Sequence, residues 1–513
     1  MPYYRSVAVR LGVCAAAALL LLAEPASAGW RWDATTVGRG LGRAVSAHQL
    51  SRLEADGYRA DLARATVVLA TSQRPELAAA LHDTAELATT YDGPRAVALF
   101  STLRVNTNLW AAPGGADVHD ADGLVYRWFA GRGFRFHPLA SFAALNQQAA
   151  AGRYRRAVRL AYALLASARP RGGGLVWESY FPWAGGRAPW TSGMTQAVAA
   201  QALARVGFRR DAHLAYRGLS AGLLASTEAG PWVRLYSFWD AAVLNAHLQA
   251  ALSLREYARR TGDGEAAALA FGLRRSASRL MPRFDTGFWT RYSLHGQEAP
   301  LSYHRYVVEL LWKLGRRTDE RRWGQWAARF RDYWRKPPEL RARGRRTAAY
   351  PVPADGFRDR AVIRFWLSKP ARVTLRVGGT LRTAFLQPGR RAFFWSPGRR
   401  SARAYPVRLS AVDRVGNRGQ RWLPPVQVRR DTVAPTIRAT AARGRLRWRA
   451  HDDATPWLWL RAVLYRGQER RRLELGRRPL SGSVRLPVRG PGWRTIVLAA
   501  DSSGNGRLLS LGG

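Results

Sequence analysis

The chain has 513 residues, of which 47% are apolar, and its 21 tryptophans are unlike the composition of a disordered chain. This length is enough for two or three domains with separate hydrophobic cores. The formal net charge of +47 favours an anionic partner, and both nucleic acid and acidic polysaccharide qualify. Lys313, Lys336 and Lys369 are the only lysines, so the arginine excess also fits a compositional bias of the source genome. The net charge by itself therefore does not identify a partner.

Residues 1–28 have the features of a secretory signal peptide. Arg5 and Arg10 form a basic region, residues 15–23 form an apolar one, and Ala26-Ser27-Ala28 is a small-residue cleavage site. The apolar stretch is shorter than the roughly 20 residues that span a bilayer, so cleavage after Ala28 is favoured over a retained membrane anchor. We therefore predict a protein that is secreted or associated with the cell envelope.

Export and signal cleavage would remove the only cysteine and would make nucleic acid an improbable partner. Cys14 is the only cysteine and lies in the apolar part of the signal, so the mature chain is predicted to have no disulfide, cysteine nucleophile or thiolate metal site. A secreted protein seldom meets nucleic acid as a substrate, and no nucleic-acid-binding motif stands out. The predicted partner is an anionic polysaccharide, with no nucleic acid and no membrane span after signal cleavage.

From about Val45 to Trp334 the apolar residues recur at intervals of three and four, which is the pattern of amphipathic helices. Turn residues such as Gly230-Pro231 and Thr261-Gly262-Asp263-Gly264 separate the periodic stretches. Successive helical hairpins must cover each other's apolar faces, either as a solenoid or as an α/α toroid around a central cleft. We predict one helical domain over residues 29–338.

Beyond residue 338 the apolar residues alternate, as in Ile363–Leu367 and Ala371–Val377, which predicts half-buried strands. The motif Ala-x-Asp-x-x-Gly-Asn occurs at residues 411–417 and again at 499–505, each time after a strand-like run. We predict two related β-sandwich modules, residues 339–434 and 435–513. They look like immunoglobulin-like or fibronectin-like modules of bacterial exported proteins.

The repeated Asp-x-x-Gly-Asn motif has the chemistry of a turn before a final strand. It could instead hold calcium, but one carboxylate and one amide are too few for an ion that takes roughly six to eight oxygen ligands. We predict turns here and no metal site. The nine histidines are scattered and no phosphate-binding loop or nucleophile elbow stands out, so no organic cofactor is predicted.

Several segments of the helical region resemble the C-terminal catalytic domain of the D-glucuronyl C5-epimerase family, over most of that domain's length. They are Gly131–Leu139 with Leu145-Asn146, Pro189–Gln196, Trp232–Tyr236 with Val243–Asn245, and Phe284–His304. Together with the alternating region after residue 338, the resemblance implies a multidomain α plus β protein. Its helical domain would be α/α toroid-like, an incomplete α/α barrel, followed by one or two β-sandwich domains.

The same resemblance implies that tyrosines carry the chemistry. Tyr236 takes the position of a catalytic tyrosine, and Tyr292 and Tyr303 match the other two functional tyrosines of the family. Carbon C5 of a uronate lies α to its carboxylate, so one group removes the C5 proton and another returns a proton from the opposite face. The implied function is C5 epimerisation of a uronic-acid-containing polysaccharide by an exported enzyme.

A tyrosine with an ordinary pKa near 10 needs positive charge or donated hydrogen bonds to serve as a base. Arg234, Arg291 and Arg305 are near enough in sequence to supply that charge, and Arg291 is the preferred partner of the uronate carboxylate. The other predicted substrate-binding residues are His304, Trp190 and Asn245. For His304 and for the aromatic stretch Trp177–Trp190, the sequence supports a structural role in the core as well as it supports a functional role.

The chain departs from the family pattern at several points. The family's two glutamates before the first tyrosine are Arg234 and Leu235 here, its histidine after the last tyrosine is Val307, and its glycine after Met-x-Gln is Ala197. Two alternatives to the epimerase therefore stay open. One is a polysaccharide lyase that shares the proton-abstraction step, and the other is a non-catalytic envelope protein that binds anionic glycan.

A glycoside hydrolase would need a pair of carboxylates as acid and as base or nucleophile. Glu178 and Asp285 are the carboxylates nearest to the matched segments. Only their proximity in sequence supports that reading.

Overall fold

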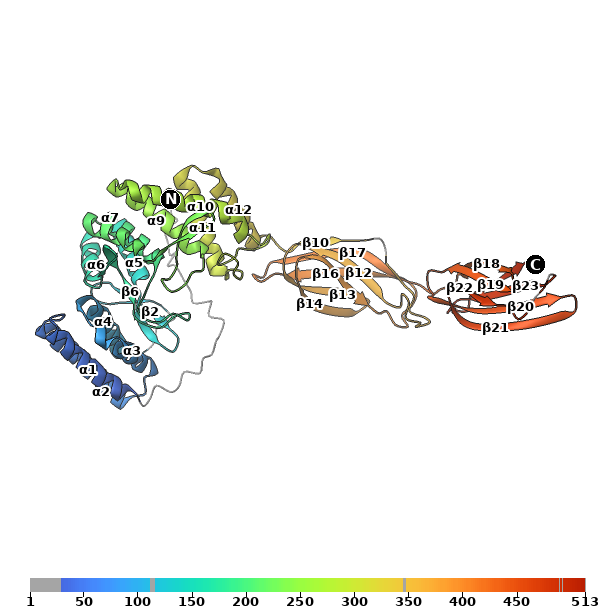
Figure 1. The fold of residues 1–513 in the computed structure, drawn as a ribbon, viewed down its shortest axis with the longest axis horizontal. Coiled ribbons are helices and arrows are strands. Elements are labelled where there is room, and N and C mark those ends of the chain that lie inside the picture. Colours follow the sequence, from blue (N-terminus) through green and yellow to red (C-terminus); the bar gives the residue numbers. More distant parts are fainter. Residues whose placement is uncertain (1–28, 111–115, 345–346, 489, 491, 513) are drawn as a thin grey trace. The chain divides into compact units, whose positions relative to one another are not determined.

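The computed structural model describes residues 29–512 except 111–115, 345–346, 489 and 491. The predicted signal peptide, residues 1–28 with Cys14, lies outside the described residues. The chain divides into two compact units, Met1–Tyr333 and Trp334–Gly513, so the protein is a mixed α and β protein (Figure 1). Within the described ranges, no helix combines the length and the apolar character needed to cross a membrane.

The first unit is built from paired helices, as its three- and four-residue periodicity predicted. Hairpins pair α1 with α2, α3 with α4, α5 with α6, α7 with α8 and α9 with α10, and α5, α7, α9 and α11 are neighbours in that order. The helices are α1 (Trp30–Ser46), α2 (Arg52–Thr71), α3 (Pro75–Glu86), α4 (Gly93–Asn108), α5 (Pro138–Ala150), α6 (Tyr154–Ala166), α7 (Gly193–Arg205), α8 (Arg209–Arg217), α9 (Leu244–Thr261), α10 (Gly264–Phe284), α11 (Leu301–Thr318) and α12 (Arg321–Arg335).

Helices α7 and α9 are the most buried helices of this unit. Every residue of α7 from Gly193 to Leu203 is buried, and so are most residues of α9. Helix α7 begins where Ser192 accepts a hydrogen bond from the backbone N–H of Thr195, which caps the helix. The Pro189–Gln196 segment therefore leads into the first turn of α7.

Short strands lie between the helices of the first unit, which the periodicity did not predict. They form small antiparallel sheets, of which β2 and β3 lead into α5, and β8 and β9 precede the loop before α9. The strands are β1 (Val118–His119), β2 (Val125–Phe129), β3 (Gly133–Phe136), β4 (Arg169–Arg171), β5 (Gly174–Val176), β6 (Glu178–Ser179), β7 (Trp190–Thr191), β8 (Leu224–Thr227) and β9 (Gly230–Val233).

The second unit contains two β modules with separate cores. The first has sheets in the order β10-β12-β15 and β11-β17-β16-β13-β14, and the second has β18-β19-β22 and β21-β20-β23-β24. The first module's strands are β10 (Leu340–Ala342), β11 (Ala348–Ala349), β12 (Ala361–Leu367), β13 (Ala371–Val377), β14 (Thr380–Leu386), β15 (Gly389–Trp395), β16 (Ala404–Val412) and β17 (Arg418–Val428). The second module's are β18 (Thr436–Ala442), β19 (Arg445–His451), β20 (Trp457–Arg466), β21 (Glu469–Pro479), β22 (Ser481–Arg485), β23 (Arg494–Ala500) and β24 (Gly506–Leu511).

The repeated Asp-x-x-Gly-Asn motif forms the predicted turn in both modules. Asp413 Oδ1 accepts hydrogen bonds from the backbone N–H groups of Val415 and Asn417, directly before β17. Asp501 Oδ1 does the same with Ser503 and Asn505, directly before β24. The alternation predicted for strands β12 and β13 also holds, since every second residue in each faces the core.

Candidate functional site

Tyr236 lies in the loop between β9 and α9 and is held there by backbone contacts. Ser237 N–H donates to Thr191 O at 2.9 Å, and Trp239 N–H donates to Tyr236 O at 3.2 Å. Gly193 allows the close approach, because a Cβ atom there would meet Arg234 O at 2.6 Å. The loop therefore packs on the start of α7 and places the Tyr236 ring 4.9 Å from the Trp190 ring.

Tyr292 comes from the loop between α10 and α11, which is fastened to the start of α9. Leu244 N–H donates to Tyr292 O at 3.2 Å, and Val243 pairs with Ser293 in an isolated bridge. The Trp239 ring lies 6.3 Å from both the Tyr236 ring and the Tyr292 ring. The N-terminal end of α9 thus joins two loops that are far apart in sequence.

Tyr303 lies in the first turn of α11, and its ring packs edge-on against that of Tyr292 at 5.1 Å. The three tyrosines taken from the sequence therefore belong to one aromatic cluster, together with Trp190 and Trp239. All three tyrosine side chains are half-buried. They gather at the N-terminal ends of α7, α9 and α11, where the helix dipoles favour negative charge.

Burial disfavours the phenolate form of each tyrosine and so raises its pKa. The three tyrosines differ in which interactions oppose that rise. Burial raises the pKa of Tyr236 to about 12, although a hydrogen bond from Trp183 acts in the other direction. Burial also raises the pKa of Tyr292, as do Tyr303 and Tyr236 beside it. Burial raises the pKa of Tyr303, and the charge of Arg127 and a hydrogen bond from Tyr292 oppose that rise.

Tyr303 is therefore the member of the cluster whose phenolate has the most support. The charge of Arg127 and a hydrogen bond from Tyr292 both lower the pKa of Tyr303, against the rise that burial causes. Tyr236 lacks a cation among the groups that shift its pKa, so its hydroxyl keeps its proton more readily. The pKa of all three phenols is raised by burial, and only for Tyr303 does a cation oppose that rise.

Arg127 is the functional candidate that sequence reasoning missed. It lies on β2, its side chain is 16% exposed, and its guanidinium donates to both carboxylate oxygens of Asp117 at 2.8 and 2.7 Å. One guanidinium nitrogen also lies 3.4 Å from His137 Nε2. Burial and Arg127 together lower the pKa of His137 to about 3, so this histidine is neutral. No sequence signal links residue 127 to residue 303, because only the tertiary fold brings β2 to α11.

The arginines predicted beside the tyrosines have other partners in the structure. Arg234 pairs with Asp240 at 3.0 Å, and Arg291 Nη1 donates to Gly296 O at 3.0 Å. Arg305 is exposed on α11. The guanidinium that acts on Tyr303 is thus Arg127, a residue from another segment of the chain.

The remaining predicted substrate-binding residues lie in different settings. His304 is fully buried, with one ring nitrogen 2.7 Å from Thr290 Oγ1 and the other 2.9 Å from Phe330 O, which is the arrangement of a core residue. Trp190 is 8% exposed and donates from Nε1 to Phe181 O, with its ring against Tyr236. Asn245 is 4% exposed in the first turn of α9.

A fourth tyrosine joins the cluster. Tyr306 packs with Tyr236, Trp239 and Tyr292 around the same small core, and its hydroxyl donates to Gln249 Oε1 at 2.8 Å. It follows Tyr303 by three residues in α11, a spacing that puts two side chains on one helix face. That spacing was the available sequence signal for Tyr306.

The two carboxylates considered for a glycoside hydrolase both form ion pairs with arginines. Glu178 is 3% exposed and accepts from Arg95 at 3.0 Å, with Arg169 also beside it. Asp285 pairs with Arg329 at 2.7 Å and accepts from the Tyr333 hydroxyl at 2.8 Å. Both side chains therefore tie elements together, and neither is placed as a solvent-facing acid or nucleophile.

Comparison with known protein families finds a match to part of the first unit. Residues 175–332 match the family model described as D-glucuronyl C5-epimerase C-terminus. No curated protein sequence matches the chain.

Solved structures with similar parts include a D-mannose isomerase, at 14% identity and a TM-score of 0.28. The match covers 39% of this chain and 60% of the isomerase chain. The fibronectin(III)-like modules of CbhA from Clostridium thermocellum match at 16% identity and a TM-score of 0.16, with 34% of this chain covering 91% of theirs. A Ca²⁺-stabilized adhesin that helps an Antarctic bacterium bind ice matches at 13% identity and a TM-score of 0.16, with 33% of this chain covering 48% of that one.

Proposed function

Since residues 175–332 match the family model of the D-glucuronyl C5-epimerase C-terminus, we propose that this protein epimerises a uronate polysaccharide at C5 through its tyrosine cluster. The single observation that carries the proposal is the meeting of Tyr236, Tyr292 and Tyr303 in one cluster. Tyr303 removes the C5 proton as a phenolate, and Tyr236 returns a proton from the opposite face. Tyr292 donates the hydrogen bond that holds the Tyr303 phenolate.

Each step of this mechanism has a physical reason. The C5 proton is acidic because the adjacent carboxylate delocalises the charge that remains on C5. Arg127 stabilises the Tyr303 phenolate and lies where it can also attract the uronate carboxylate, so one cation serves base and substrate. The family's glutamates are replaced by Arg234 and Leu235, and Arg234 pairs with Asp240, so the acid and base roles fall to tyrosines in this chain.

Two finer features belong to the same proposal. The row of α5, α7, α9 and α11, with α6, α8 and α10 against it, supports the α/α toroid-like arrangement expected of the domain. Export through residues 1–28 would bring the enzyme to the cell envelope or outside it, where uronate polymers occur. The N-terminal sequence pattern supports export.

Solvent deuterium provides the direct test. Incubation in deuterium oxide with heparosan, unsulfated chondroitin or polymannuronate is expected to place deuterium at C5 of one polymer, as read by proton NMR. Tyr303→Phe removes the base, and we expect exchange to fall by about 100-fold or more. Tyr162→Phe, an exposed tyrosine outside the cluster, should exchange as the unaltered protein does.

The outcomes separate the alternatives. An unsaturated product that absorbs in the ultraviolet would identify a polysaccharide lyase, which shares the proton abstraction but then expels the 4-linked sugar. Tight binding to a polymer that gains no deuterium would identify a glycan-binding protein. Undiminished exchange in Tyr303→Phe would contradict the role given to that tyrosine.

A further inference from the structure

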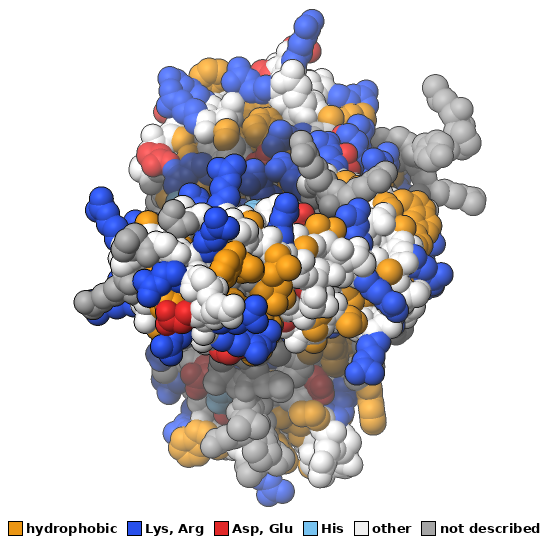
Figure 2. Space-filling model, turned by 90° about the vertical axis from the view of Figure 1, so that its right-hand side faces the viewer, with side chains coloured by type: hydrophobic (Ala, Val, Ile, Leu, Met, Phe, Trp, Pro, Cys, Tyr) orange, Lys and Arg blue, Asp and Glu red, His pale blue; other side chains and the backbone are white. Residues whose placement is uncertain are grey.

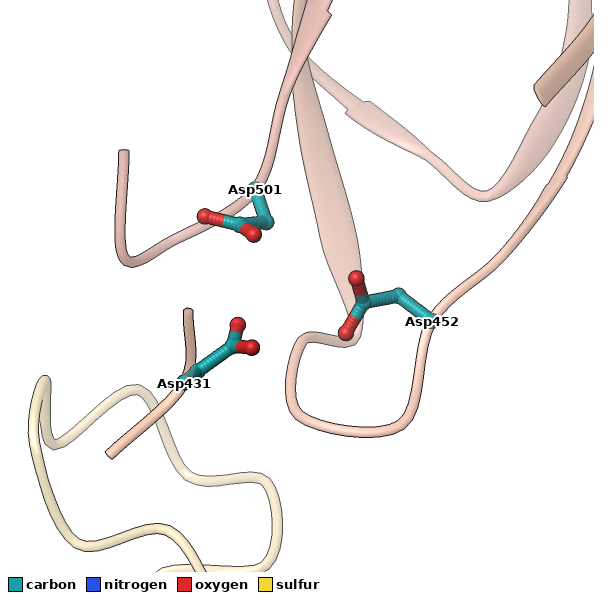
Figure 3. A group of neighbouring side chains, drawn as sticks. All are labelled: Asp431, Asp452 and Asp501. Atoms are coloured by element: carbon teal, nitrogen blue, oxygen red, sulfur yellow. The ribbon is translucent and has the colours of Figure 1, made fainter. Parts of the chain in front are cut away.

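Three aspartate carboxylates meet where the chain joins the second β module. Asp431 precedes β18, Asp452 lies between β19 and β20, and Asp501 follows β23. Figure 3 shows their carboxylates turned toward one another, and one oxygen from each lies within 4.8 Å of the others. Two oxygens bound to one Ca²⁺ at about 2.4 Å lie at most about 5 Å apart, so these three can share an ion.

The carboxylates have no countercharge in the part of the chain that the structure describes. Asp501 is 1% exposed, and Oδ2 of Asp431 is shielded from solvent and accepts no hydrogen bond. None of the three forms an ion pair with a described arginine or lysine, although the chain has 82 basic residues against 35 acidic ones. Asp501 is buried, Asp431 and Asp452 are half-buried, and three carboxylates this close repel one another, so a cation would stabilise the cluster.

The first β module contains the same site with a cation built in. Asp413 is the counterpart of Asp501, and Lys369 Nζ donates to Asp413 Oδ2 at 2.8 Å and to Lys336 O at 2.6 Å. Lys369 is 7% exposed, so its ammonium is buried between the turn and the chain that leads into the module. An ammonium thus occupies the place that a metal ion would take.

Two contacts establish that the sites correspond. The Nδ2 group of Asn417 donates to Trp334 O in the first module, and the Nδ2 group of Asn505 donates to Asp431 O in the second. In sequence, Lys369 and Thr455 each precede the proline that comes just before a core strand, β13 or β20. The second module therefore has a neutral threonine where the first has its ammonium, and two additional carboxylates nearby.

We propose that Asp431, Asp452 and Asp501 bind one Ca²⁺ ion, which does in the second module what Lys369 does in the first. The ligand set is all oxygen and comes from irregular loops, which suits Ca²⁺, and no histidine or cysteine belongs to the cluster as a zinc site would require. Backbone carbonyls and water complete the coordination. The ion fastens the segment before β18 to the two loops of the module.

Calcium titration of the full chain tests the site. After treatment with a chelator, the protein is titrated with CaCl₂ by calorimetry, and we expect one ion per chain with a dissociation constant on the order of 10⁻⁴ to 10⁻³ M. Calcium should also raise the temperature of one unfolding transition in differential scanning calorimetry, since it binds only the folded module.

Asp452→Asn is the informative variant. Asp452 Oδ1 accepts backbone hydrogen bonds from Ala454 and Thr455, and an asparagine oxygen can accept the same bonds, so the loop is kept while a charge is lost. We expect its calcium affinity to fall at least about tenfold. Asp453→Asn is the matched control, because it removes the same charge one residue away from a side chain that is 70% exposed.

Three results would overturn the proposal: no heat of binding up to about 10 mM CaCl₂, unchanged affinity in Asp452→Asn, or an equal loss in Asp453→Asn. Asp431→Asn provides a second variant outside the turn, and it should lose affinity as Asp452→Asn does. The test is independent of the proposed epimerisation, since the cluster belongs to the second unit and the tyrosines to the first.

Discussion

At the scale of single residues, the candidate site depends on how a tyrosine is made basic. Partial burial raises the pKa of Tyr303, and the charge of Arg127 and a hydrogen bond from Tyr292 oppose that rise. Arg127 is itself held by Asp117, which fixes its position beside the cluster. Arg127 lies outside residues 175–332, so the matched segment by itself lacks the cation of the proposed base.

Replacing Arg127 should change the pH dependence of exchange. A positive charge lowers the pKa of a phenol, so Arg127→Gln raises the pKa of Tyr303, and the rising limb of the pH profile moves to higher pH. We expect activity at pH 7 to fall by about tenfold or more and to recover in part at alkaline pH. Deuterium exchange measured from pH 6 to pH 10 provides the readout.

Arg127→Lys is the control for this variant, because it keeps the charge and should keep the profile near its original position. A loss in Arg127→Gln that is equal at every pH would show that Arg127 acts on the structure and not on the Tyr303 phenolate.

At the scale of elements, buried polar contacts fix how the central helices meet. Glu256 on α9 accepts from Gln201 Nε2 at 2.6 Å and from Arg205 Nη2 at 2.6 Å, both on α7, and from Arg260 at 3.1 Å. Burial opposes the charged form of Glu256, but these donors outweigh it and lower its pKa to about 2. The network holds together the two helices whose N-terminal ends carry the tyrosine loops.

This network makes the helical unit sensitive to acid. The folded-state pKa of Glu256 is below its ordinary value of 4.5, so its stabilising contribution is complete above that value and is lost as the pH falls toward 2. Glu256→Gln should lower the free energy of unfolding by about 3 kcal/mol at pH 7 and by less at pH 3. Urea unfolding followed by circular dichroism at several pH values measures both.

Glu309→Gln is the comparison, because Glu309 pairs with Lys313 on the surface of α11 and the pair is largely exposed. We expect a cost below about 0.5 kcal/mol there. Equal costs for the two variants, or a cost for Glu256→Gln that does not depend on pH, would argue against the buried network.

At the scale of the whole molecule, positive charge is spread widely over the surface. Figure 2 shows Lys and Arg side chains across the viewed face with few Asp and Glu among them, in keeping with the net charge of +47. Such a surface raises the local concentration of a polyanion and speeds its encounter with the protein. The charge is a property of both units and does not by itself mark a site.

Polymer binding should therefore depend strongly on salt. We expect the affinity for heparosan to fall several-fold between about 50 and 200 mM NaCl, because exposed charges are screened beyond a Debye length. Neutral dextran is the control and should show no salt-dependent binding. Affinity electrophoresis or light scattering can follow both, and binding to heparosan that is indifferent to salt would contradict the electrostatic attraction.

Much of the fold followed from local patterns. Three- and four-residue periodicity predicted the helices, alternation predicted β12 and β13, and the repeated Asp-x-x-Gly-Asn motif predicted the turn in each β module. The short strands β1 to β9 were missed because hairpins of two to five residues show too few alternations to stand out among helices. The sequence predicted that the helical domain ends at residue 338, and the structure divides the chain into two units after Tyr333.

The sequence by itself determined which residue types lie in which kind of element, because helices, strands and turns depend on neighbours along the chain. It also singled out Tyr236, Tyr292 and Tyr303 from their motifs. Only the tertiary structure decided that the charge of Arg127, and not that of Arg291, lowers the pKa of Tyr303, and that Asp431 and Asp452 join Asp501. These are contacts between residues distant in sequence, whose electrostatic effect depends on separation in space, which no local pattern records.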